Sequence, residues 1–341
     1  MPSDPGASRW PATAAGIVRE VVGLAAEPGP LEARAEALLA QLQRVVPFDA
    51  GWIALLPADR AAHVALARSG YDERVCGYLD SASVLGDVEL VGLQRSRRPI
   101  RGRDMTIPAS EVRGWAEYVQ PSGFRDGVSL GLFTPDGRYL GVLALHTELA
   151  DQVSDAARDL LELLAAPIAA AVDPWRSLAT IAGLVRHATA GVVLTSSGAV
   201  QPLPGLPDHR LLAPGSQVLA AAVVQLAAGG PYSSFLAPLP ESDGAGTHAR
   251  ITVLAAPPDL RLFAAAVVLV SSAGDLHGLS ERELQVLGLL VTGATNEQIA
   301  QDLGLSARTV EVHVQHVRAK LAAPSRTTAA ARALRLGLFV P

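Results

Sequence analysis

The segment TNEQIAQDLGLSARTVEVHVQHVRAKL, residues 295–321, carries the pattern that decides the fold of the C-terminal part of the chain. Thr295 and Gln298 have the spacing of a capping box, which predicts the start of a short helix. Gly304 supplies the tight turn after that helix, and Ser306 has the position of an N-cap for the next one. Two helices joined by so short a turn predict a helix-turn-helix motif.

The second helix of this motif is predicted to have one apolar and one polar face. Its apolar residues recur at steps of four, three and four, as expected for a single buried stripe; they are Val310, Val314, Val317 and Leu321. The residues expected on the opposite face are Arg308, Thr309, Glu311, Val312, Gln315, His313, His316 and Lys320. A helix with a docked apolar stripe and an outward polar half can enter the major groove of DNA.

Residues 279–339 as a whole resemble a LuxR-type DNA-binding domain. The family's characteristic residues fall on Glu283, Leu287, Gly293, Thr309, Val310, His313, Lys320 and Leu321. The resemblance implies a four-helix domain whose third helix binds double-stranded DNA. The contacts that it implies, together with the two helix caps, are Thr295, Ser306, Arg308, Thr309, Glu311, Val312, His313, Gln315 and Lys320. Glu311, Val312 and Gln315 are the expected base contacts, and because several family members carry lysines at the first and third of these positions, the operator sequence stays open.

The resemblance also implies that the last helix, about residues 325–336, pairs two copies of the chain into a homodimer. The residues expected at this contact are Ala329, Ala330, Ala333 and Leu334. Small side chains there would allow two helices to approach closely. A dimer would also place two recognition helices on half-sites about one DNA turn apart.

Lys320 is the only lysine of the chain, whose other basic side chains are arginines. The resemblance implies that its flexible ammonium group reaches a DNA phosphate as a point charge. The alternative is that it is an accident of an arginine-rich coding background. Glu311 leaves alternatives open as well, because it would accept from a cytosine amine, orient Arg308, or pair in solvent.

The charge is divided unevenly along the 341 residues, which carry a formal net charge of −5. From residue 276 to the end there are seven basic and five acidic side chains, so the remainder is strongly acidic. A basic segment on an acidic body suits nucleic-acid contact confined to that segment. The length and the 49% hydrophobic content suit two or three domains with real cores.

Three parts are predicted ahead of residues 276–341. Residues 1–30 look like a tail that runs into a short helix. Residues 31–173 are similar to a GAF-type sensor domain, with a helix, a hairpin, a helical crossover, a hairpin at Asp136-Gly137 and a helix after Ser154. Residues 176–272 repeat this plan loosely and resemble a PAS-like α/β module. The predicted fold class is multidomain, with α/β sensor modules followed by an all-α four-helix domain.

The sensor part contains aromatic residues where a GAF pocket would be lined, namely Trp52, Trp115, Tyr118 and Phe124. They would line a ligand pocket or simply belong to the core. His146 is expected to be a structural or pocket-rim residue. Cys76 is expected to be a packed, apolar side chain rather than a reactive or ligand-attaching thiol, because no basic partner stands beside it.

Several classes of protein are disfavoured. No signal peptide or membrane span is predicted, so we expect a cytoplasmic protein. A single cysteine, unclustered histidines and the absence of phosphate-loop, HExxH and GxSxG motifs give no basis for an enzyme, a metal site or a cofactor. The best prediction is a dimeric, sequence-specific transcriptional regulator controlled by an unidentified small molecule or protein partner. The alternative is an interaction module whose helix-turn-helix is only a scaffold.

Overall fold

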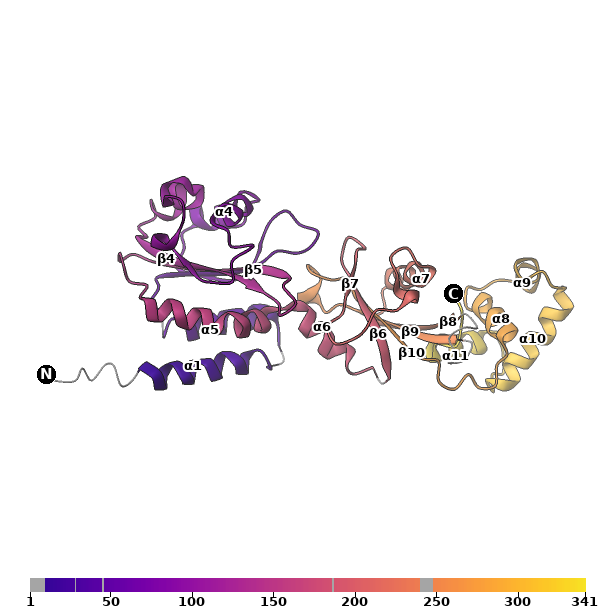
Figure 1. Ribbon diagram of the computed structural model, residues 1–341. Coiled ribbons are helices and arrows are strands. Elements are labelled where there is room, and N and C mark those ends of the chain that lie inside the picture. Colours follow the sequence, from indigo (N-terminus) through magenta and orange to yellow (C-terminus); the bar gives the residue numbers. More distant parts are fainter. Residues whose placement is uncertain (1–9, 28, 45, 186, 240–247) are drawn as a thin grey trace. The chain divides into compact units, whose positions relative to one another are not determined.

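The computed structural model describes residues 10–27, 29–44, 46–185, 187–239 and 248–341. The chain divides into two compact units, the first ending at Pro174 and the second beginning at Trp175. Each unit contains one antiparallel sheet, and the second also contains the C-terminal helices (Figure 1). In the described ranges no helix has both the length and the apolar character that crossing a membrane requires.

The first unit is a five-stranded sheet with helices on both faces (Figure 1). The strand order is β2-β1-β5-β4-β3, with β1 at Ala50–Leu55, β2 at Val64–Ser69, β3 at Ile100–Arg101, β4 at Asp126–Phe133 and β5 at Tyr139–Thr147. One face carries α2 (Leu31–Leu42) and α5 (Asp155–Val172), on which α1 (Trp10–Leu24) packs. The other face carries α3 (Glu73–Leu79), α4 (Ser83–Val91) and the π-helix η3 (Trp115–Val119).

The local signals in the sequence account for most of these elements. Strands β4 and β5 pair as the predicted hairpin, and Gly137 in its turn has a φ of +95°, which glycine adopts without strain. Helix α5 begins after Ser154, whose hydroxyl accepts a hydrogen bond from the Ala157 amide at 3.1 Å. Helix α2, the predicted first helix of this domain, spans Leu31–Leu42.

The central strands send alternate side chains to the two faces of the sheet. On one face of β1 a side chain at Gly51 would meet Leu39 of α2 at 3.0 Å, so the strand and the helix are in close contact there. The other face of β1 carries Ala50, Trp52 and Ala54, which pack with residues of α3 and α4. This alternation turns Trp52 toward the α3 and α4 side of the sheet.

The sheet of the second unit has the order β7-β6-β10-β9-β8, so its five strands are connected in the same order as those of the first sheet. Its strands are β6 (Ala188–Leu194), β7 (Val200–Pro202), β8 (Tyr232–Pro238), β9 (His248–Ala255) and β10 (Ala266–Ser272). Helix α6 (Pro174–Ala182) precedes the sheet in sequence, and α7 (Gln217–Ala227) lies between β7 and β8. The loose repeat predicted from the sequence is therefore a repeat of topology. Strands β7 and β8 were not predicted, because one has three residues and both contain proline, which is found at sheet edges.

Four helices complete the second unit: α8 (Glu281–Val291), α9 (Asn296–Leu303), α10 (Ala307–Lys320) and α11 (Arg326–Leu336). The predicted caps are present, since Thr295 and Gln298 form a capping box and Gly304 has a left-handed conformation. The predicted stripe of α10 is buried at Val310, Val314, Val317 and Leu321. The helices form one apolar core, which also includes Leu236 of β8.

Candidate DNA-binding surface and ligand cavity

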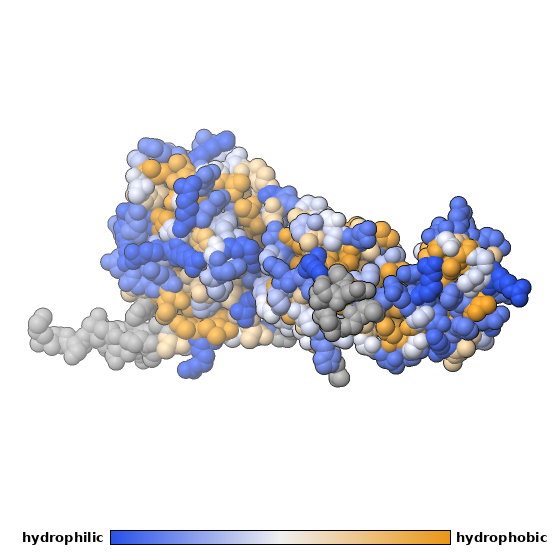
Figure 2. Space-filling model, turned by 45° about the vertical axis from the view of Figure 1, so that its right-hand side comes forward, coloured by the Kyte–Doolittle hydropathy of each residue, from blue (hydrophilic) through white to orange (hydrophobic). Residues whose placement is uncertain are grey.

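Helix α10 exposes the residues that would meet DNA bases. Arg308, Glu311, Val312 and Gln315 are all exposed, and Val312 keeps 43% of its surface accessible. An exposed valine beside polar side chains is suited to a contact with a thymine methyl group. On the face shown in Figure 2, hydrophilic side chains surround small apolar patches over the C-terminal helices. The surface therefore fits a polar partner better than a large apolar one.

The capping residues of the motif are committed to the helix ends. Ser306 accepts from the Thr309 amide at 3.1 Å, and the two hydroxyls lie 2.8 Å apart. Thr295 accepts from the Gln298 amide at 3.3 Å. His313 and Thr309 are only partly exposed. Ser306 therefore caps the N-terminus of α10, and Thr295 caps the N-terminus of α9.

Lys320 has a protein partner that the sequence did not predict. Its ammonium group lies 2.6 Å from Glu283 Oε2, and the Glu283 side chain is only 4% exposed. Glu283 also accepts from the Ser280 amide at 2.7 Å, and His316 Nδ1 lies 3.7 Å from its other oxygen. Burial by itself raises the pKa of Glu283, but the hydrogen bonds from Lys320 and Ser280 outweigh burial and hold the pKa below its usual range.

This ion pair connects α8 and α10 across 37 positions of sequence. No local pattern predicts such a pair, because each residue alone resembles a solvated charge on a helix. The Lys320 side chain is 36% exposed, so its contact with a DNA phosphate remains a prediction. Its role in joining the two helices is what the sequence analysis missed.

Most arginines of the helical domain also bind within the domain. Arg282 donates to the Leu303 carbonyl at the end of α9 at 2.5 Å, and Arg326 donates to Ala294 at 2.5 Å. Arg332 donates to the Ala322 carbonyl at 2.7 Å, and Arg318 to Ala323 at 3.4 Å. Such bonds satisfy carbonyl groups at helix ends and in the loops between helices. Much of the basic surplus therefore stabilises the helices, and Arg308 is the basic residue in the first turn of α10.

The predicted dimer contacts of α11 require a correction. Ala329 and Ala333 are fully buried in the helical core, so a second copy of the chain cannot touch them, and their assignment to a dimer contact was wrong. Their spacing of four residues places both on the face that packs inside the domain. Ala330 is partly exposed and Leu334 is 49% exposed, so these two remain accessible for pairing.

The residues after α11 bind the sheet of the second unit. The Leu236 amide of β8 donates to the Phe339 carbonyl at 2.8 Å, and Phe339 is buried in the apolar core of that sheet. Arg250 of β9 donates to the carbonyls of Leu336 and Ala273 at 2.7 and 2.8 Å. Through these contacts the predicted 176–272 and 276–341 domains form one compact unit.

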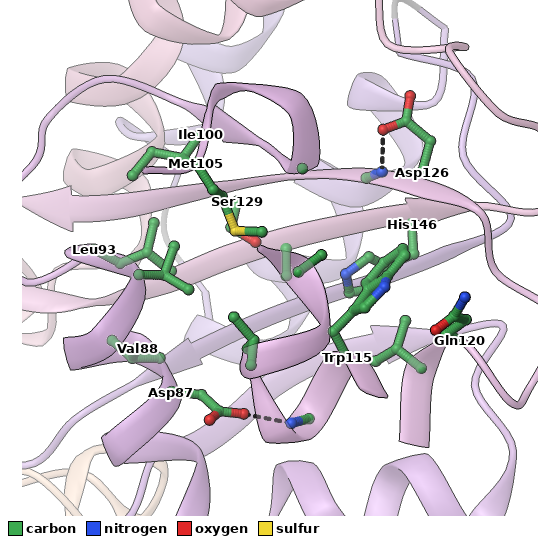
Figure 3. Close-up of a pocket in the computed structure, with 18 of the residues that line it drawn as sticks. Asp87, Val88, Leu93, Ile100, Met105, Trp115, Gln120, Asp126, Ser129 and His146 are labelled. Atoms are coloured by element: carbon green, nitrogen blue, oxygen red, sulfur yellow. Dashed lines mark hydrogen bonds between the residues drawn. The ribbon is translucent and has the colours of Figure 1, made fainter. Parts of the chain in front are cut away.

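The first unit contains a cavity of about 400 Å³ on the α3 and α4 side of its sheet (Figure 3). Trp52 and Trp115, for which the sequence left a pocket wall and the core as alternatives, line it together with aliphatic side chains from α4 and the sheet. Its polar lining includes Asp87, Ser129 and His146. The volume lies in the range of small-molecule sites, and a mostly apolar wall with a few polar groups is typical of them.

Two of the predicted pocket residues belong to the core instead. Tyr118 stacks on Tyr78 with ring centroids 4.4 Å apart and does not line the cavity. Phe124 is 3% exposed and packs against Tyr71. Aromatic character in the sequence does not separate residues that line the cavity from residues packed in the core, because large rings are common in both places. Cys76 donates to the Tyr71 carbonyl at 3.9 Å and also lies outside the cavity wall.

Fold and surface together define a protein with an α/β pocket domain and a C-terminal helix-turn-helix. Residues 30–173 match the family model of the GAF domain, and residues 277–333 match that of the luxR family of bacterial regulatory proteins. The C-terminal domain thus belongs to the luxR family, and the first unit contains a GAF domain.

Among curated proteins, the chain is 56% identical over 50 residues to the transcriptional regulatory protein FixJ of Rhizobium meliloti, which is 15% of this chain and 24% of FixJ. It is 41% identical over 58 residues to the HTH-type transcriptional regulator MalT of Yersinia pestis, covering 17% of this chain and 6% of MalT. The chain therefore spans less than a third of the relatives that it matches.

Among solved structures, the GAF domain of a phosphoenolpyruvate-protein phosphotransferase from Coxiella burnetii is 17% identical, with 51% of this chain and 98% of that one covered and a TM-score of 0.39. Escherichia coli SdiA is 16% identical, with 95% and 98% covered and a TM-score of 0.34.

Proposed function

We propose that this protein is a sequence-specific DNA-binding transcriptional regulator, which binds as a homodimer and is controlled by a small molecule held in the GAF cavity. The observation that carries the proposal is the exposed face of α10, where Arg308, Glu311, Val312 and Gln315 project from a helix whose opposite face is buried. Many DNA-binding proteins contact base edges in the major groove with the polar outer face of a helix.

The test is selection of duplexes from a random library by the full chain, followed by sequencing of the retained DNA. We expect one enriched motif containing two half-sites, because two recognition helices would bind together. Gln315→Ala should reduce discrimination between the motif and random DNA by about 1–3 kcal/mol for each half-site, if Gln315 contacts a base. Gln217→Ala is the matched control, since Gln217 is an exposed glutamine of α7 in the same unit.

A scaffold without DNA contact is the competing function. It would give no enriched motif, and Gln315→Ala would then leave every measured retention unchanged. Retention of DNA that falls as the salt concentration rises would support contact with phosphates. A weaker retention by Arg308→Ala would assign part of that contact to Arg308. Arg261→Ala provides the charge-matched control because Arg261 is exposed on the second unit's sheet domain.

A further inference from the structure

The floor of the GAF cavity is built from small side chains between two large rings. Across β1, β5 and β4 the register places Trp52 beside Ala144 and Ala144 beside Ser129. Two residues further along β5, on the same face of the sheet, the register places His146 beside Gly127. Residues at paired positions share a face of the sheet, so Trp52 and His146 rise from a floor of alanine, serine and glycine. Two indole rings, those of Trp52 and Trp115, line the space above this floor, and aromatic walls favour a planar occupant.

His146 presents one ring nitrogen to this space. Its Nδ1 atom lies 2.7 Å from the Tyr71 hydroxyl, and Tyr71 does not line the cavity. Gly127, by contrast, does line the cavity. A Cβ atom added to Gly127 would lie 3.3 Å from Nε2 of His146. Burial lowers the pKa of His146 to about 4, so the ring is neutral at pH 7.

The neutral ring becomes a hydrogen-bond donor toward the cavity. Burial raises the pKa of Tyr71, so its hydroxyl keeps its proton and can donate to Nδ1. The remaining proton of a neutral imidazole then resides on Nε2. Trp52 also lines the cavity, but its indole N–H is buried away from the open space. His146 Nε2 is therefore the donor that an occupant would meet.

The charged groups of the wall disfavour an anion. Three carboxylates line the cavity, on Asp87, Asp126 and Asp151, against two guanidinium groups. One of these guanidinium groups, on Arg103, already donates to the Val153 carbonyl at 2.7 Å, and the other belongs to exposed Arg125. An occupant carrying a phosphate or carboxylate would thus face a net negative wall in a partly dry space.

We propose that the GAF cavity binds a neutral, planar, largely apolar molecule whose carbonyl-type oxygen accepts a hydrogen bond from His146 Nε2. Trp115, which also packs near His146 with ring centroids 5.8 Å apart, supplies an aromatic wall beside this acceptor (Figure 3). The inference rests on the proposed function only in taking this cavity as the effector site.

The test uses three bicyclic probes of similar size with the full chain: coumarin, which is neutral and has a ring carbonyl; naphthalene, which has no acceptor; and coumarin-3-carboxylate, which is anionic. Dissociation constants come from ligand-observed NMR titrations at pH 7. We expect coumarin to bind about tenfold more tightly than naphthalene, the size of one net hydrogen bond, and the carboxylate to bind more weakly than coumarin.

Variants then assign the effect to the cavity. His146→Phe should abolish the difference between coumarin and naphthalene while naphthalene still binds. His63→Phe is the matched control, because His63 is a buried histidine that also contacts a tyrosine hydroxyl, Tyr139 at 3.1 Å, but lies outside the cavity wall. Ala144→Leu should weaken all probes by filling the floor, and thermal unfolding verifies that each variant is folded.

Four results would overturn the proposal: no coumarin binding, equal affinities for coumarin and naphthalene, tighter binding of the carboxylate with dependence on Arg125, or a preference for coumarin that survives His146→Phe. Retention of DNA by the same preparations without any probe is measured in parallel. Intact DNA binding with failed probe binding rejects the ligand class alone, whereas lost DNA binding rejects the proposed function.

Discussion

Removing the chain's only lysine should destabilise the helical domain through the carboxylate that it leaves behind. Lys320→Ala deletes the ammonium group 2.6 Å from Glu283, whose side chain is 4% exposed. Breaking a fully buried pair costs about 3–5 kcal/mol, and an exposed pair contributes about 0–1 kcal/mol. The Lys320 side chain is 36% exposed and Glu283 retains its bond from Ser280, so solvent screening reduces the cost to about 1–3 kcal/mol.

The loss of stability in Lys320→Ala should depend on pH. In the native protein the pKa of Glu283 lies below its ordinary value, so the stability contributed by its charge is present above pH 4.5 and is lost as the pH falls through the lowered pKa. In Lys320→Ala burial dominates and raises that pKa. The difference in free energy of unfolding between native protein and variant should then be greatest near pH 7. It should shrink as the pH falls toward 4.5, because the Glu283 carboxyl group of the variant becomes neutral. His316, the other basic group facing Glu283, is retained in both proteins.

The assay is hydrogen exchange of the α8 and α10 amides in the full chain, corrected for intrinsic exchange rates, which reports the free energy of local opening. The double variant Lys320→Ala with Glu283→Gln should recover most of the loss, because no buried charge remains unpaired. Arg335→Ala is the control for a simple loss of positive charge from the domain. A deficit below about 0.5 kcal/mol at pH 7, or one that is constant down to pH 4.5, would refute the reasoning.

The same double variant separates the two roles of Lys320. If the lysine only supports Glu283, the double variant should bind DNA as the native chain does. If Lys320 also contacts a phosphate, binding to all sequences should stay weak, and the slope of log affinity against log salt should fall by about one unit.

Three further outcomes are expected. If Glu311 contacts a base, Glu311→Lys should tighten binding to random DNA. The difference in binding free energy between operator and random DNA should then fall by about 1–3 kcal/mol per half-site in a titration at fixed salt. An unchanged difference would mean that neighbouring residues of α10 discriminate between sequences. Leu334→Asp should impair dimerisation with little loss of fold, whereas Ala333→Asp should unfold the helical domain, as sedimentation and circular dichroism would distinguish. Phe339→Ala should remove about 3–5 kcal/mol from the second unit in urea unfolding, and an effect below 1 kcal/mol would show that the C-terminal residues do not anchor the helices.

Local signals in the sequence were sufficient for much of the fold. The caps at Thr295 and Ser306, the glycine turn and the spacing of the buried valines depend on residues a few positions apart, and all of them are present in the structure. The Asp136-Gly137 hairpin and the helix after Ser154 follow for the same reason. Backbone conformation and side-chain periodicity act over one or two turns, so a short stretch contains the information.

The tertiary structure supplied what depends on distant partners. Lys320 and Glu283 look like two solvated helix charges until packing brings α8 against α10. Ala333 looks like a contact for another chain until its face is seen to be buried within its own, and Tyr118 and Trp115, close in sequence, lie in the core and in the cavity wall. A helical period defines which residues share a face, but what that face packs against is fixed only when the free energy of the whole fold is minimised.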